Sequence, residues 1–145
     1  MSRRPEILLV EDNPADVDLL LETFEMVELD VKVNVARDGV EALEFLHRRG
    51  KFKDAPTPRL VLLDLNLPKV DGRAVLAEVK QAPGLRRIPV IVLSSSSSEK
   101  DMSESYDLHA NAYVRKPAGI REYKALVRAL DGFWCKLVKQ PRSPA

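Results

Sequence analysis

The chain has 145 residues, of which 45% are hydrophobic and 31% are charged, and its formal net charge is +1. This length suits one domain that buries roughly two-thirds of its unfolded surface, and the near-neutral charge argues against a nucleic-acid partner. A single cysteine, Cys135, excludes an internal disulfide and a zinc cluster built on cysteines. The apolar run 7–10 is too short for a signal-peptide core or a membrane span, so we expect a cytoplasmic protein with no membrane partner.

Short β-rich runs alternate with longer amphipathic segments along the chain. We predict strands at 7–10, 31–36, 60–64, 89–94 and 112–115, and helices near 14–28, 39–49, 72–81, 99–109 and 119–138. Such alternation predicts an α/β fold in which helices cover both faces of a parallel sheet. The strands at 60–63 and 90–93 are continuously apolar, as central strands are, whereas 31–35 alternates. These patterns favour a doubly wound five-stranded sheet in the order 2-1-3-4-5.

Local signals define the helix ends and the extent of the domain. Asn13 followed by proline predicts a helix start, and Gly50 predicts the end of the second helix. The connection 47–59 is long and basic; a solvated loop is the simpler interpretation, and a docking patch for an acidic partner is the alternative. No linker divides the chain, so we predict one domain over 1–139 and a frayed tail at 140–145.

Acidic residues follow the first and third predicted strands. The first strand ends in Glu11 and Asp12, and the third ends in Asp64. In this sheet the strand order reverses between these two strands, which is where ligands bind. Three carboxylates in one crevice repel one another, and a divalent cation offsets that repulsion. Oxygen ligands without a neighbouring histidine or cysteine favour Mg²⁺.

Two other strand ends point to the same crevice. The fourth strand ends in Ser94, which supplies a hydroxyl, and the fifth is followed by Lys116, whose ammonium can neutralise a phosphate oxygen. A metal, a hydroxyl, an ammonium and a carboxylate nucleophile together predict phosphoryl transfer onto Asp64.

Four motifs carry a resemblance to a known family. Residues 7–13 (ILLVEDN), 62–68 (LLDLNLP), 92–94 (VLS) and 113–117 (YVRKP) resemble the response-regulator receiver domain of two-component systems. The resemblance covers about residues 6–130 and implies the flavodoxin-like (βα)5 fold of the chemotaxis receiver CheY. It also implies that a histidine kinase is the partner and that its phosphohistidine donates the phosphoryl group.

The resemblance implies a role for each residue of the site. Asp64 would be the phosphoacceptor, and Ser94 and Lys116 would bind the incoming phosphoryl group. Mg²⁺ would be held by carboxylates of Asp12 and Asp64, by the backbone carbonyl of Asn66, and by Glu11 through water.

The resemblance also implies two features around Lys116. The Lys116–Pro117 peptide bond is expected to be cis, which would aim the lysine into the site. Tyr113 matches the aromatic switch residue, which turns inward when the hydroxyl of Ser94 moves toward phosphate.

A narrower similarity concerns the partner. The segments 11–20 and 64–68, the long second connection and the pair Phe133-Trp134 resemble stand-alone receivers of phytochrome histidine kinases. We therefore expect a bacteriophytochrome as the kinase. The stretch after Pro117 suits one helix and a tail rather than an attached DNA-binding domain, so output should pass through protein–protein contacts.

The predicted last helix carries an apolar stripe at helical spacing, made of Ile120, Tyr123, Leu126, Val127, Leu130, Phe133, Trp134, Leu137 and Val138. Part of the stripe must cover the sheet, and its far end is free to meet a second copy. We expect a homodimer through the fourth helix, the fifth strand and the fifth helix.

Three other classes of protein share features of this pattern. A Mg²⁺-dependent phosphatase with an aspartate nucleophile needs an acid two residues after Asp64, where this chain has Asn66, which cannot protonate a leaving group. A phosphate-independent binding module would not need the acids, the hydroxyl and the lysine. A flavin module needs a phosphate-cradling loop after the first strand, where acids stand instead. We therefore predict a phosphoacceptor that is not a turnover enzyme.

Overall fold

The structure is a computed structural model that describes residues 4–135 and 138–140. Its strands are β1 (Glu6–Val10), β2 (Lys32–Ala36), β3 (Leu60–Leu63), β4 (Val90–Ser94) and β5 (Ala112–Arg115). Its α-helices are α1 (Pro14–Met26), α2 (Gly39–His47), α3 (Gly72–Gln81), α4 (Glu99–Asp107) and α5 (Ile120–Leu130). A 3₁₀ turn, η1 (Gly50–Phe52), and a π-helical turn, η2 (Asp131–Cys135), complete the described elements.

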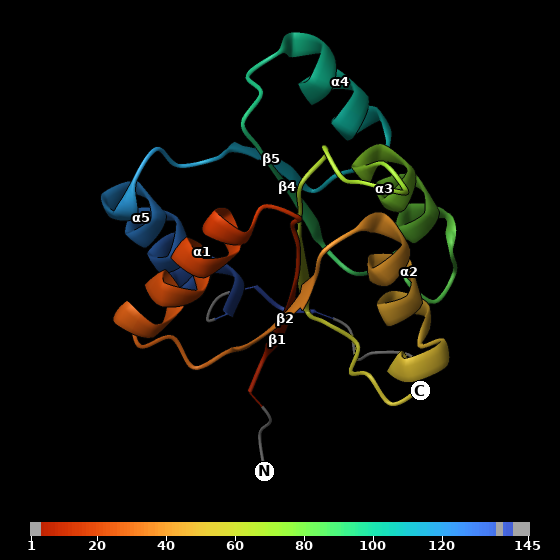
Figure 1. Ribbon diagram of the computed structural model, residues 1–145, viewed down its shortest axis with the longest axis horizontal. Coiled ribbons are helices and arrows are strands. Elements are labelled where there is room, and N and C mark those ends of the chain that lie inside the picture. Colours follow the sequence, from red (N-terminus) through yellow and green to blue (C-terminus); the bar gives the residue numbers. More distant parts are fainter. Residues whose placement is uncertain (1–3, 136–137, 141–145) are drawn as a thin grey trace.

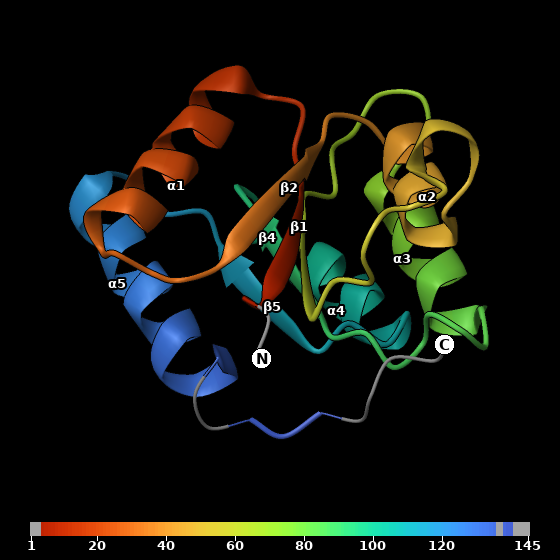
Figure 2. The same cartoon turned by 90° about the horizontal axis from the view of Figure 1, so that it is seen from below.

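The five strands form one parallel sheet in the order β2-β1-β3-β4-β5. Helices α1 and α5 lie on one face of the sheet, and α2 and α3 lie on the other, with α4 beyond them beside β5 (Figures 1 and 2). The predicted α/β doubly wound fold is confirmed. Because the order reverses between β1 and β3, their carboxyl ends open onto one crevice.

The core consists of two apolar layers that follow the alternation of the strands. On β1, Leu8 and Val10 pack with α2 and α3, whereas Ile7 and Leu9 pack with α1 and α5. Strands β3 and β4 are buried at every position. Continuous burial of both faces explains why their sequences are uniformly apolar.

The observed starts of the helices agree with the predicted starts more closely than the observed ends agree with the predicted ends. The Asn13 side chain caps α1 by accepting hydrogen bonds from the amides of Ala15 and Asp16. The second helix ends earlier than predicted, at His47, because Arg48 takes the left-handed conformation (φ 58°) that closes it, and Gly50 begins η1 instead.

The last helix differs most from its prediction. The α-helix ends at Leu130 and continues as the π-helical turn η2, which contains Gly132. Glycine lowers α-helix propensity, and a π turn adds one residue to the repeat, so it rotates the side chains that follow. The predicted continuation through 136–137 and most of the predicted tail, 141–145, lie outside the described residues.

The basic connection 47–59 is partly structured. The ring of Phe52 in η1 packs edge-on against Phe45 with centroids 5.3 Å apart, and the Lys51 ammonium lies 5.1 Å from the Phe52 centroid. Docking of an acidic partner at this connection stays the alternative to the simpler interpretation, a solvated loop. Among the described residues, no helix combines the length and apolar character needed to cross a membrane.

Candidate phosphoryl-transfer and metal site

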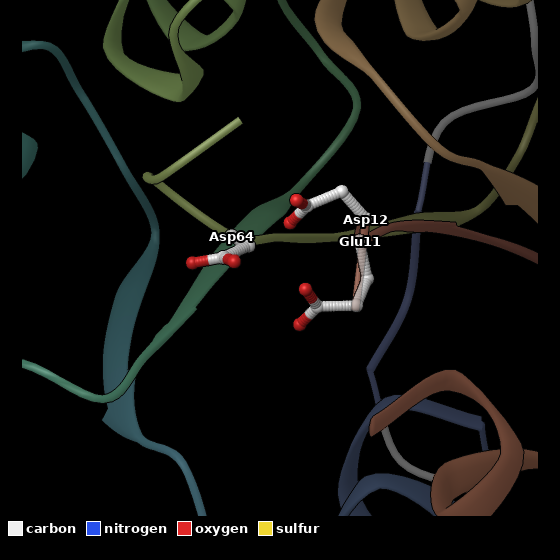
Figure 3. Close-up of side chains that lie close together, drawn as sticks. All are labelled: Glu11, Asp12 and Asp64. Carbon is white, nitrogen blue, oxygen red and sulfur yellow. The ribbon is translucent and has the colours of Figure 1, made fainter. Parts of the chain in front are cut away.

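Three carboxylates meet at the crevice between β1 and β3. Glu11 and Asp12 directly follow β1, and Asp64 directly follows β3. Each offers one oxygen such that all three oxygens lie within 4.8 Å of one another (Figure 3). Glu11 and Asp64 are buried, whereas Asp12 is exposed and opens the cluster to solvent. The spacing and the all-oxygen donor set fit a divalent cation such as Mg²⁺.

Lys116 inserts its ammonium among the carboxylates from the end of β5. Its Nζ lies 2.6 Å from Glu11 Oε1, 3.0 Å from Asp16 Oδ2 and 3.4 Å from Asp64 Oδ2. The sequence pattern predicts the neighbourhood of Lys116 and Asp64 but does not include Asp16, which lies in the first turn of α1. Its position one turn after the acidic pair was the available signal.

The electrostatics of the cluster follow from burial. Desolvation raises the pKa of Glu11 to about 7, against the opposing effect of its hydrogen bond with Lys116. Burial also lowers the pKa of Lys116, but its bonds to Glu11 and Asp16 and the nearby charge of Asp64 outweigh that effect and raise it overall. Lys116 therefore stays charged and balances part of the negative charge of the site.

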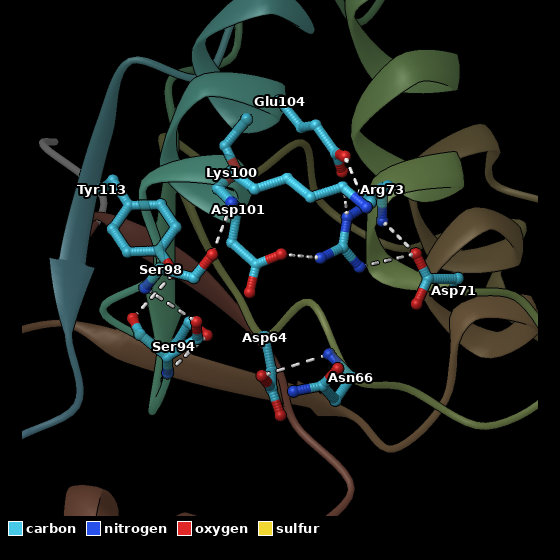
Figure 4. A network of polar contacts seen from close by, with 12 residues as sticks. Asp64, Asn66, Asp71, Arg73, Ser94, Ser98, Lys100, Asp101, Glu104 and Tyr113 are labelled. Carbon is cyan, nitrogen blue, oxygen red and sulfur yellow. Dashed lines mark hydrogen bonds and ion pairs between the residues drawn. The ribbon is translucent and has the colours of Figure 1, made fainter.

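Ser94 and Tyr113 both form a hydrogen bond with Ser96, in the turn that follows β4. Ser94 is fully buried, and its Oγ accepts a hydrogen bond of 3.2 Å from the amide of Ser96. The Tyr113 hydroxyl donates to the backbone carbonyl of Ser96 at 2.9 Å. The side chain of Tyr113 is thereby bonded to the turn that follows Ser94 (Figure 4).

The segment after Asp64 shapes the floor of the site. The amide of Asn66 donates to Asp64 Oδ1 at 3.3 Å, which fixes one carboxylate oxygen. Gly72 packs so closely beneath this segment that a Cβ there would lie 2.3 Å from the carbonyl oxygen of Asp64. A glycine at this position therefore allows α3 to begin directly under the site.

One expectation about the backbone is wrong. No cis peptide bond occurs among the described residues, so the Lys116–Pro117 bond is trans. Trans is the intrinsically favoured isomer of a bond before proline, and Lys116 reaches the carboxylates with it. The lysine position is supported by the hydrogen bond from its amide to the carbonyl of Ser94, at 2.7 Å.

Comparison with known proteins identifies the family. Residues 7–128 match the family described as the response regulator receiver domain. The chain belongs to this family, the phosphoryl-accepting modules of two-component signalling.

Two relatives are similar to this chain over nearly their whole length. The response regulator Rcp1 of Synechocystis is 45% identical over 135 residues, which are 93% of this chain and 92% of that protein. The structure of the Mn²⁺-bound form of Rcp1 matches with a TM-score of 0.87 at 44% identity, over 95% of this chain and 99% of that one. The phosphorylated cyanobacterial phytochrome response regulator RcpA matches with a TM-score of 0.90 at 44% identity, over 97% and 100%.

Proposed function

We propose that this response regulator accepts its phosphoryl group on Asp64. The assignment rests on the position of the Asp64 carboxylate. It lies beside the Lys116 ammonium, and it is close enough to Glu11 and Asp12 for the three carboxylates to bind one metal ion. A carboxylate oxygen of Asp64 forms the new P–O bond, while the P–N bond to the kinase histidine breaks and its nitrogen keeps the electron pair. Lys116 then neutralises a phosphoryl oxygen, and Ser94 donates its hydroxyl hydrogen to another.

The metal assignment rests on the same cluster. Asp12 and Asp64 would hold Mg²⁺ through carboxylate oxygens, Asn66 through its backbone carbonyl and Glu11 through water. Bound Mg²⁺ would supply positive charge that offsets the phosphoryl oxygens. Tyr113 would be the switch residue that responds to phosphorylation, since its hydroxyl is hydrogen-bonded to the turn after Ser94.

We also propose that the chain is not a turnover enzyme. The residue two positions after Asp64 is Asn66, which offers no proton to a leaving group. The kinase partner is proposed to be a phytochrome-type histidine kinase, because RcpA is a phytochrome response regulator and matches nearly the whole chain. A cytoplasmic location stays a prediction.

The dimer proposal is supported by exposed apolar side chains on the α4–β5–α5 side. Phe133 is 56% exposed, Tyr106 on α4 is 50% exposed and Ile120 is 38% exposed. Phe133 packs edge-on against Trp134 with centroids 5.8 Å apart, which presents a preformed aromatic pair. Aromatic side chains of this kind are enriched at protein–protein interfaces.

Phosphoryl acceptance can be tested by intact-mass measurement after incubation with acetyl phosphate, with and without Mg²⁺. We expect a gain of ~80 Da, one phosphoryl group, that requires both Mg²⁺ and Asp64. Asp64→Asn should abolish the gain, and Asp54→Asn, a matched change at an exposed acid of the connection 47–59, should leave it intact. A folded wild-type protein that gains no mass under any condition would contradict the proposal.

A further inference from the structure

Arg73, in the first turn of α3, joins α3 to α4. Its guanidinium contacts Asp101 Oδ1 at 2.5 Å and Glu104 Oε2 at 2.9 Å, both on α4, and Asp71 Oδ2 at 3.4 Å, at the N-cap of α3 (Figure 4). The Arg73 side chain is only 28% exposed. Asp101 and Glu104 stand three residues apart and so share one face of α4. The rigid fork of arginine suits such a multiple contact better than lysine would.

Helix α4 depends on polar contacts because it has little apolar anchoring. Ser105 is its only buried residue. An isolated exposed ion pair would contribute little to stability. This network, in contrast, is partly shielded from solvent, and its one cation is shared among several carboxylates. Loss of Arg73 would therefore destabilise the first turn of α4. The effect would be larger than that of losing one ion pair from a helix that is also anchored by an apolar face.

The network continues from α4 into the turn after β4. The amide of Asp101 donates to Ser98 Oγ at 3.3 Å. Hydrogen bonding by Ser96 and by Arg73 also lowers the pKa of the Asp101 carboxyl. Ser96 is fixed by three hydrogen bonds. Its Oγ accepts from the Ser98 amide at 3.1 Å, its carbonyl accepts from the Tyr113 hydroxyl, and its own amide donates to Ser94 Oγ. Asp101 thus connects Arg73 with the turn that positions Ser94.

The bond from the Ser96 amide has a chemical consequence for Ser94. Because Ser94 Oγ acts as the acceptor in this bond, its hydrogen remains available for donation. When the Asp64 oxygen bonds to phosphorus and the leaving group departs with its electron pair, negative charge lies on the phosphoryl oxygens. A preorganised hydroxyl stabilises that charge without reorganisation during the reaction.

We propose that Arg73 is a positioning residue for phosphoryl transfer: through Asp101 and Ser96 it holds the turn 95–98 so that the Ser94 hydroxyl faces the phosphoryl group. This inference rests on the proposed function of Asp64. Arg73 touches neither the donor nor Asp64, and its effect passes through Ser94.

The test is the rate of phosphorylation by acetyl phosphate, with Mg²⁺, followed by intact mass. Arg73→Gln should slow the reaction about three- to tenfold, because misplacement of a positioned group costs rate without removing it. Arg87→Gln, the same charge change at an exposed arginine after α3, should react at the wild-type rate. In a Ser94→Ala background, Arg73→Gln should change the rate less than about twofold, since the two substitutions remove one shared effect.

A second readout concerns the protein without phosphate. Amide hydrogen exchange of the peptide covering 95–101 should be faster in Arg73→Gln than in Arg87→Gln, because the turn loses its anchor. If Arg73→Gln does not fold, Arg73→Lys serves in the same comparisons, since it keeps the charge and loses the fork.

The outcomes separate this inference from the proposed function. A wild-type rate in Arg73→Gln, or an equal slowing with and without Ser94, would overturn the inference alone. Absence of phosphorylation in the wild-type protein would overturn the proposed function and the inference together.

Discussion

Glu11 is buried between β1 and the Lys116 ammonium, and burial raises its pKa to about 7. Since this value lies above the ordinary 4.5 of the unfolded chain, the folded protein binds more protons between these two pH values. Its contribution to stability is therefore complete below pH 4.5 and is lost as the pH rises through 7.

This shift predicts the pH dependence of Glu11→Gln in metal-free protein. The free energy of unfolding of the wild type should fall by about 1–3 kcal/mol between pH 5 and pH 8, and the variant should lose that part of the slope. Urea unfolding in EDTA at several pH values measures it. Asp18→Asn, at an exposed acid of α1, should keep the wild-type slope, and an equal slope in all three proteins would refute the assignment to Glu11.

At the scale of elements, the start of α3 packs directly against the backbone of Asp64 and so helps to fix its position. A methyl group at Gly72 would meet the Asp64 carbonyl at 2.3 Å, whereas a methyl group at Gly132 in η2 would meet no atom within 4 Å. The two glycines therefore have opposite consequences, although both lie in helical segments.

Alanine substitutions make this contrast measurable. Gly72→Ala should lower the free energy of unfolding by about 1–3 kcal/mol, because α3 must move away from the site. Gly132→Ala should raise it by about 0.5–1 kcal/mol through helix propensity. Thermal or urea unfolding of both variants measures these changes in the free energy of unfolding. Equal effects of the same sign would contradict the packing argument.

At the scale of the whole molecule, the last helix and the turn after it combine a packed face with exposed apolar side chains. Tyr123, Val127 and Leu130 are buried against the sheet, while Ile120 and Phe133 remain exposed. The dimer proposal rests on these large apolar side chains, which stay in solvent beyond the packed face.

The proposed dimer predicts how association responds to Phe133→Ser. We expect wild-type protein to form dimers and the variant to have a dimer dissociation constant about tenfold higher or more, as for an aromatic residue central to an interface. Sedimentation velocity at several concentrations measures it. Val40→Ser is the matched control, because Val40 is a 39% exposed apolar residue on α2, across the sheet. Unchanged association in Phe133→Ser would remove Phe133 from the interface.

Much of the architecture follows from local sequence. Uniformly apolar runs identify the central strands β3 and β4, and an asparagine before proline identifies the start of α1. The carboxylates after β1 and β3 also follow from sequence, because strand order alone brings their carboxyl ends together. These features depend on residues that are neighbours in the chain or on a sheet rule that is independent of side-chain detail.

Other features were decided only by tertiary structure. Asp16 contacts Lys116 although 100 residues separate them, and Arg73 reaches Asp101 across 28 residues. Neither pairing has a periodic signature, because the first depends on how α1 packs beside the connection after β5 and the second on how α3 packs beside α4. The left-handed Arg48, the trans bond before Pro117 and the π turn after Leu130 are likewise backbone conformations that no local pattern of the sequence specifies. The sequence determined the sheet and its acids, whereas packing between elements selected the partners of the charges, because differences of about 1 kcal/mol in local preference are smaller than the packing terms.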